Sequence, residues 1–119
     1  MTPPTTSYRR GDVVLVPFPF TDLSTTKQRP ALVVSPDAWN ASQADVMLVA
    51  ITSQISPQSG SGSLPLETAD WQAAGLPKPS LIRPTKLFTM HQGLIRRSLG
   101  QLPESATTRV LAELRKFLS

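Results

Sequence analysis

Arg29-Pro30-Ala31-Leu32-Val33-Val34-Ser35 is the stretch that decides the fold, because its apolar, partly β-branched run predicts a strand. A second apolar run, Val49-Ala50-Ile51, ends in Thr52-Ser53-Gln54 and so supplies two hydroxyls and an amide. If the two runs are neighbouring antiparallel strands, Arg29 and Thr52 meet at one end of a sheet. A permanent cation beside hydroxyl donors can bind a phosphate group. Nucleic acid is therefore the first candidate partner.

The length of the chain, 119 residues, predicts a single domain. We expect residues 1–8 to be a flexible lead-in and residues 9–119 to form that domain. Hydrophobic residues make up 39% of the chain and the mean hydropathy is −0.09, which indicates a globular protein. No apolar stretch approaches the roughly 20 residues that span a bilayer, and the first seven residues lack the features of a signal peptide. The sequence thus predicts no association with membranes.

The charge balance is basic, with 12 Lys and Arg against 8 Asp and Glu and an isoelectric point near 10.1. That value is typical of nucleic-acid binders, although a net charge of +4 is modest. The chain contains no cysteine, which excludes disulfides and thiolate chemistry. This composition fits a reducing compartment, and we predict a cytoplasmic location.

Short apolar runs separated by turn residues predict a mainly β (α+β) fold, a small antiparallel barrel or sheet with one terminal helix. The helix is expected over about 104–118, where apolar residues recur on one face. Long loops are expected at 17–28 and 55–63. Strands are expected at 12–17, 31–34, 46–52, 64–66, 80–83 and 85–90, with a break at Pro84. Single helical turns are expected at 38–41 and 70–74.

The residue inventory limits the chemistry. The only histidine is His91, which we interpret as a surface turn residue, and the eight acids form no metal-binding cluster. The sequence therefore predicts neither a metal nor a cofactor. Guanidinium and hydroxyl groups can hold a phosphodiester and stabilise charge on its oxygens, but they do not readily generate hydroxide. If the protein is catalytic, the substrate must supply the nucleophile, as the 2′-hydroxyl of RNA does.

Simpler interpretations remain open for each of these residues. Arg29 can be a solvated arginine before a strand, and the hydroxyls after Ile51 can cap a turn. Arg83 and Lys86 can be ordinary charges on an edge strand. Phe18 and Phe20 are the best candidates for stacking on bases, because they lie in the long first loop.

Four segments together resemble the MazF/PemK toxins of type II toxin–antitoxin systems, over residues 9 to 118. They are Gly11-Asp12-Val13-Val14, the Arg29–Ser35 stretch, Ile51-Thr52-Ser53-Gln54, and the late segment from Gly75-Leu76 through Ser80-Leu81-Ile82-Arg83 to Thr89. The resemblance implies an SH3-like barrel of the CcdB/PemK type that forms a homodimer. It also implies metal-independent, sequence-specific cleavage of single-stranded RNA to a 2′,3′-cyclic phosphate.

The resemblance implies that Arg29 and Thr52 are the catalytic pair. It also implies an acidic antitoxin that acts at the first loop, with DNA binding by the toxin–antitoxin complex. The residues expected to contact RNA are Phe18, Phe20, Thr21, Lys27, Ser53, Gln54, Arg83 and Lys86.

The chain also departs from the family pattern. Many relatives have Gln-Ile-Arg-Thr where this chain has Lys86-Leu87-Phe88-Thr89, so the target sequence cannot be carried over. Two alternatives remain: a protein-directed toxin on the same fold, like the gyrase poison CcdB, and a module that binds RNA without cutting it.

Overall fold

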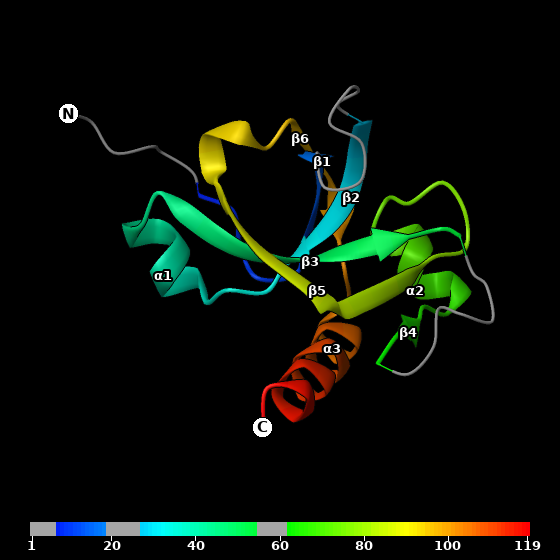
Figure 1. Cartoon of the computed structure of the whole chain (residues 1–119). Coiled ribbons are helices and arrows are strands. Elements are labelled where there is room, and N and C mark those ends of the chain that lie inside the picture. The colour runs from blue at the N-terminus through cyan, green and yellow to red at the C-terminus, as the bar shows by residue number, and fades with distance from the viewer. Residues whose placement is uncertain (1–6, 19–26, 55–61) are drawn as a thin grey trace.

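The computed structural model describes residues 7–18, 27–54 and 62–119. These residues form an antiparallel six-stranded sheet in the order β4-β5-β3-β2-β1-β6 (Figure 1). The strands are β1 Asp12–Phe18, β2 Lys27–Val33, β3 Asp45–Thr52, β4 Leu64–Pro65, β5 Leu81–His91 and β6 Arg97–Gln101. The helices are α1 Asp37–Ser42, α2 Thr68–Ala73, the 3₁₀ turn η2 Gln92–Leu94 and α3 Glu104–Phe117.

The sheet curls, and both of its faces are covered. Along β3, Val49 and Ile51 join a cluster that packs against the helices, whereas Val46 and Leu48 join a second cluster on the opposite face. This division follows from the alternation of side chains along a strand. It also explains why β3 has the most continuously apolar sequence, since a strand buried on both sides cannot alternate apolar with polar residues.

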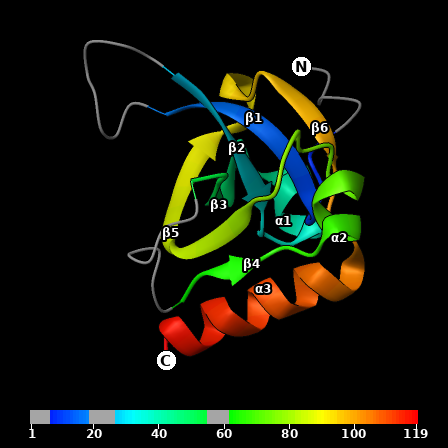
Figure 2. The same cartoon turned by 90° about the vertical axis from the view of Figure 1, so that its right-hand side faces the viewer.

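The C-terminal helix α3 covers one face of the curled sheet beside β4 and β5 (Figure 2). Its apolar side buries Ala106, Val110 and Leu114 in the first cluster. The predicted mainly β fold with a C-terminal helix is confirmed. None of the helices in the described ranges is long and apolar enough to cross a membrane.

The predicted break at Pro84 was wrong. Residues 81–91 form one strand, β5, which pairs with β3 on both sides of Pro84. The register shifts between Val49, which is opposite Leu87, and Ala50, which is opposite Arg83. The three residues 84–86 therefore bulge out of the ladder, and a bulge needs no N–H donor from proline.

Strand β6 was not predicted at all, and β2 begins at Lys27, four residues before the expected start. The first loop is correspondingly shorter than expected, because β1 continues to Phe18. The close approach of β6 to the end of α2 depends on two glycines, Gly75 and Gly100. A Cβ atom on Gly100 would lie 2.7 Å from backbone atoms of Ala74, so only glycine fits there.

Candidate nucleic-acid interface

The ends of β2 and β3 separate where the two predicted catalytic residues lie. Pairing between the strands stops at Ala31 and Ala50, directly beside Pro30, which has no N–H to donate. Continued for two residues, the same register would place Arg29 opposite Thr52. Both residues also share the sheet face of Ala31 and Ala50, because side chains alternate along a strand. The strand ends thus present a guanidinium and a hydroxyl on the same side of the sheet.

The turn after β3 orients the hydroxyl of Thr52. The backbone N–H of Gln54 donates a hydrogen bond to Thr52 Oγ1, with 3.1 Å between the two atoms. Because this bond occupies a lone pair of the oxygen, the hydroxyl hydrogen remains available for a ligand acceptor. Thr52 and Ser53 are half-buried, and Gln54 is exposed.

Arg29 and Thr52 both line a groove with a volume of about 850 Å³. Strands β1, β2, β3, β5 and β6 contribute to its walls, together with the segment that follows α2. Five cations line it, namely Arg29, Lys78, Arg83, Lys86 and Arg97. No aspartate or glutamate occurs among the described residues that line it. The groove therefore concentrates positive charge, although the net charge of the chain is only +4.

The ion pairs of the described residues lie outside the groove. They join Arg9 to Asp37, Arg109 to Asp70 and Lys116 to Glu113. Each of these acids pairs with a cation elsewhere on the surface, so none of these three ion pairs uses a groove cation. In the part of the chain that the structure describes, no group of three or more His, Cys, Asp or Glu residues could hold a metal ion.

The groove brings together six of the ten residues that the sequence predicted: Arg29, Thr52, Ser53, Gln54, Arg83 and Lys86. Lys27 is exposed at the start of β2 and is not among the groove residues. Phe18 is the last residue of β1, opposite Lys27. Phe20 and Thr21 lie outside the described residues.

His91 is exposed at the far end of β5, where its Nδ1 accepts a hydrogen bond from the N–H of Gly93. The residue caps the 3₁₀ turn η2 and does not line the groove, so its interpretation as a surface turn residue is confirmed.

Two groove cations were missed by sequence reasoning. Lys78 stands between two prolines in the segment after α2, and Arg97 opens the unpredicted strand β6. A sequence signal for Arg97 did exist, because the pair Arg96-Arg97 follows the apolar residue Ile95. Without strand β6, however, nothing connected that pair to the ends of β2 and β3.

Residues 9–118 match the family model described as a PemK-like, MazF-like toxin of type II toxin–antitoxin systems. The chain belongs to this toxin family. The match covers all the described groove residues, so the groove is part of the toxin domain itself. No curated protein of similar sequence matches the chain.

Solved structures share the fold of this PemK-like, MazF-like toxin. A mycobacterial endoribonuclease in complex with its cognate antitoxin has a TM-score of 0.75 at 19% identity, covering 94% of this chain and 95% of its own. MazF in a MazE–MazF complex from Deinococcus radiodurans has a TM-score of 0.75 at 19% identity, with 95% and 97% coverage. The Mycobacterium tuberculosis toxin MazF-mt6 has a TM-score of 0.70 at 17% identity, with 90% and 95% coverage.

Proposed function

We propose that this toxin is an endoribonuclease that cuts single-stranded RNA in the groove between the ends of β2 and β3. The observation that carries the proposal is the shared position of Arg29 and Thr52 in a groove with five cations and no described carboxylate. Two proteins of the same fold, at 19% and 20% identity, are endoribonucleases. Because no acid occurs among the described residues of the groove wall, the groove favours a polyanionic substrate over a cationic one.

In the proposed reaction the substrate supplies both the nucleophile and the leaving group. The 2′-oxygen of one ribose forms a bond to phosphorus, and the bond from phosphorus to the 5′-oxygen of the next nucleotide breaks. The 2′-hydroxyl loses a proton and the 5′-oxygen gains one, so the products are a 2′,3′-cyclic phosphate and a 5′-hydroxyl. The reaction consumes no water and changes no oxidation state.

Arg29 and Thr52 serve the phosphoryl oxygens in this reaction. The guanidinium of Arg29 stabilises the negative charge that gathers on them, and the hydroxyl of Thr52 donates a hydrogen bond to one of them. A guanidinium is a poor general base. Water therefore carries the proton from the 2′-hydroxyl in this proposal.

The test is cleavage of single-stranded RNA in EDTA, beside a copy of the same strand with 2′-deoxy sugars throughout. We expect the wild type to cut only the RNA and to leave a cyclic phosphate. Arg29→Ala should lower the rate by about 10²–10³, the usual cost of losing a donor to the transition state. Arg115→Ala is the matched control, because Arg115 is an exposed cation on α3 and does not line the groove.

Each remaining outcome contradicts a part of the proposal. Cleavage of the 2′-deoxy strand would exclude the 2′-hydroxyl as nucleophile. RNA binding without cleavage would indicate the non-catalytic module. Growth arrest on expression with neither binding nor cleavage of RNA would indicate a protein-directed toxin.

We also propose an acidic antitoxin as the partner that blocks this groove, in a cytoplasmic complex. Two proteins of similar fold are known in complexes with antitoxins, and the groove offers positive charge to an acidic segment. RNA and that segment should then exclude one another, which competition binding would measure.

A homodimer is expected from the family resemblance, and light scattering should give twice the 12.9 kDa of one chain.

A further inference from the structure

One wall of the groove is a short segment that is anchored at both of its ends. Residues 75–80, called the wall segment below, run from α2 past β6 to β5 (Figure 2). Near its start, the N–H of Leu76 donates a hydrogen bond of 3.0 Å to the carbonyl of Trp71, and the Leu76 side chain is buried in the first core cluster. At its end, the carbonyl of Ser80 accepts a hydrogen bond of 3.0 Å from the N–H of Leu66. The exposed residues between these two anchors are therefore held in place by the fold.

Two prolines restrict the backbone of Lys78, the exposed cation in the middle of the wall segment. The ring of Pro77 fixes its own φ near about −65°. Pro79 disfavours the helical region for the residue before it, which is Lys78, and so keeps that residue extended. A lysine with a restricted backbone can direct its side chain along few paths. Both prolines thus limit where the ammonium group of Lys78 can lie.

Ser80 restricts the same backbone from the other side of Pro79. The hydroxyl of Ser80 donates a hydrogen bond to the carbonyl oxygen of Lys78, with 2.9 Å between the two atoms. Because that carbonyl turns with ψ of Lys78, the bond fixes ψ as well. Only 3% of Ser80 is exposed, so little water competes for the bond. The hydroxyl therefore completes the restraint that the two prolines begin.

A direct contact with RNA is the rival role for Ser80, because the residue also lines the groove. A serine hydroxyl carries a single hydrogen, and the carbonyl of Lys78 already accepts it. A phosphate diester has only acceptors to offer, so it cannot use the remaining lone pairs of the hydroxyl oxygen. The effect of Ser80 on a bound phosphate must then pass through Lys78.

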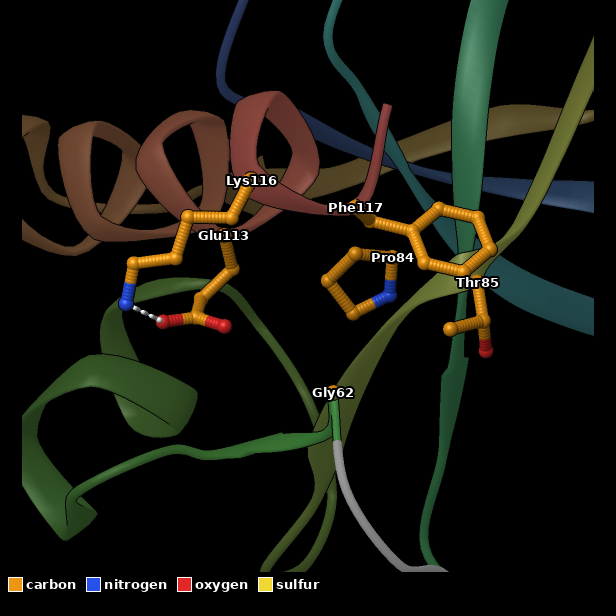
Figure 3. Close-up of a pocket in the computed structure, with 6 residues that line it drawn as sticks. All are labelled: Gly62, Pro84, Thr85, Glu113, Lys116 and Phe117. Atoms are coloured by element: carbon orange, nitrogen blue, oxygen red, sulfur yellow. Dashed lines mark hydrogen bonds and ion pairs between the residues drawn. The ribbon is translucent and has the colours of Figure 1, made fainter. Parts of the chain in front are cut away.

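The ammonium group of Lys78 has no carboxylate partner in the described part of the chain. Lys116, at the end of α3, shows the other arrangement. Its Nζ atom lies 3.2 Å from Oε1 of Glu113, beside a small pocket of about 260 Å³ (Figure 3). Lys78 instead lines the groove, where no aspartate or glutamate occurs among the described residues. Its charge is available for a charge-assisted hydrogen bond to a phosphate.

We propose that Ser80 and Pro79 are positioning residues that hold Lys78 toward a phosphate of the bound strand. This rests on the proposed function, because it specifies how the groove holds the RNA backbone. A lysine side chain loses conformational freedom when it binds a phosphate, and a backbone that is already fixed leaves less freedom to lose. The contact is made to the backbone of the strand, so it strengthens binding without selecting a base.

The test is a double-mutant cycle on the binding of a pool of 2′-deoxy oligonucleotides with randomised sequence, which the proposed chemistry cannot cut. Lys78→Ala should weaken binding by about tenfold, the cost of a hydrogen bond to a charged group. Ser80→Ala should weaken it by about 2- to 10-fold, the cost of ordering one further side chain. In the Lys78→Ala background, Ser80→Ala should weaken binding no further. A general loss of structure would weaken binding in both backgrounds.

Pro79→Ala gives a second and independent test. Pro79 is exposed and is not among the residues that line the groove, so this variant should fold and loses no contact with RNA. It does release the backbone of Lys78 from the restriction that a following proline imposes. Pro79→Ala should therefore weaken binding by about 2- to 10-fold when Lys78 is present and not at all in the Lys78→Ala background.

Two matched controls lie outside the groove. Thr107→Val also removes a buried hydroxyl that donates to backbone carbonyls, those of Leu102 and Pro103. It should lower the temperature of thermal unfolding and leave the affinity for the pool unchanged, because Thr107 does not line the groove. Lys116→Ala removes an exposed lysine that is paired with a carboxylate, and it should also leave the affinity unchanged.

The positioning role is refuted if the wild type does not bind the pool, or if either Ser80→Ala or Pro79→Ala binds it as tightly as the wild type. It is also refuted if either substitution weakens binding equally with and without Lys78. A protein that shows this coupling but leaves RNA intact would refute the endoribonuclease and retain the positioning role. A protein that cuts RNA while the effects of Ser80→Ala and Lys78→Ala simply add would do the reverse.

Discussion

At the scale of single residues, the hydroxyl of Thr52 gives the sharpest prediction. Thr52→Val keeps the shape of the side chain and removes its donor, so the rate of RNA cleavage should fall by about 10²–10³. Thr52→Ser keeps the donor and should keep most of the rate. Single-turnover cleavage measures both, with thermal unfolding as the check that neither variant has lost its fold. Equal rates for the wild type and the valine variant would remove Thr52 from the proposed mechanism.

The groove residues that could be predicted from the sequence are those at the ends of strands with a clear apolar pattern. Arg29 and Thr52 end two strongly apolar strands, and a strand end can be read from a pattern of side chains. Lys78 and Arg97 lie in segments with no such pattern. The place of Arg97 in the groove follows from the pairing of β6 with β1, which is a contact between residues far apart in sequence. Local sequence carries little information about such contacts.

At the scale of elements, the two largest errors have different physical origins. Pro84 was interpreted as the end of a strand, because proline cannot join a ladder. A bulge accommodates it, however, and β5 continues on the other side. The segment Arg97–Gln101 is rich in polar and small residues, so its sequence did not indicate a strand. It is an edge strand with mostly exposed side chains, where burial imposes little apolar character.

The junction between α2 and β6 should not tolerate a side chain on Gly75. This residue has φ of +76°, and an added Cβ would lie 2.0 Å from the carbonyl oxygen of Leu99. Gly75→Ala should therefore reduce the free energy of unfolding by at least about 1–3 kcal/mol, the cost of a left-handed conformation for a residue other than glycine. The midpoint of urea unfolding measures the change.

Gly93→Ala is the control for that experiment. The added Cβ would come no closer than 3.0 Å, and its nearest neighbours are ring atoms of the exposed His91, which can move. We expect a change within about 1 kcal/mol, the usual propensity difference between the two residues. Equal midpoints for the two variants would show that the backbone near Leu99 yields easily, contrary to the close packing described for β6.

At the scale of the whole molecule, the fold separates charge from hydrophobic core. The described acids that form ion pairs do so with Arg9, Arg109 and Lys116, which lie outside the groove. The two hydrophobic core clusters lie on opposite faces of the sheet. The sequence could indicate the basic character of the chain but not the place where the charge gathers. That place depends on the curl of the sheet, which brings the β6 residue Arg97 to the ends of β2 and β3.

This distribution of charge predicts how RNA binding responds to salt. All five groove cations are available to phosphates of a bound strand. Each phosphate neutralised on a single strand contributes about 0.7 to the slope of log K against log salt, so the slope should be about −3.5. Lys78→Ala should bring it to about −2.8, while Arg115→Ala should alter neither slope nor affinity. Titrations at several salt concentrations, at fixed pH, measure these slopes. A wild-type slope near zero would mean that the groove does not bind the RNA backbone.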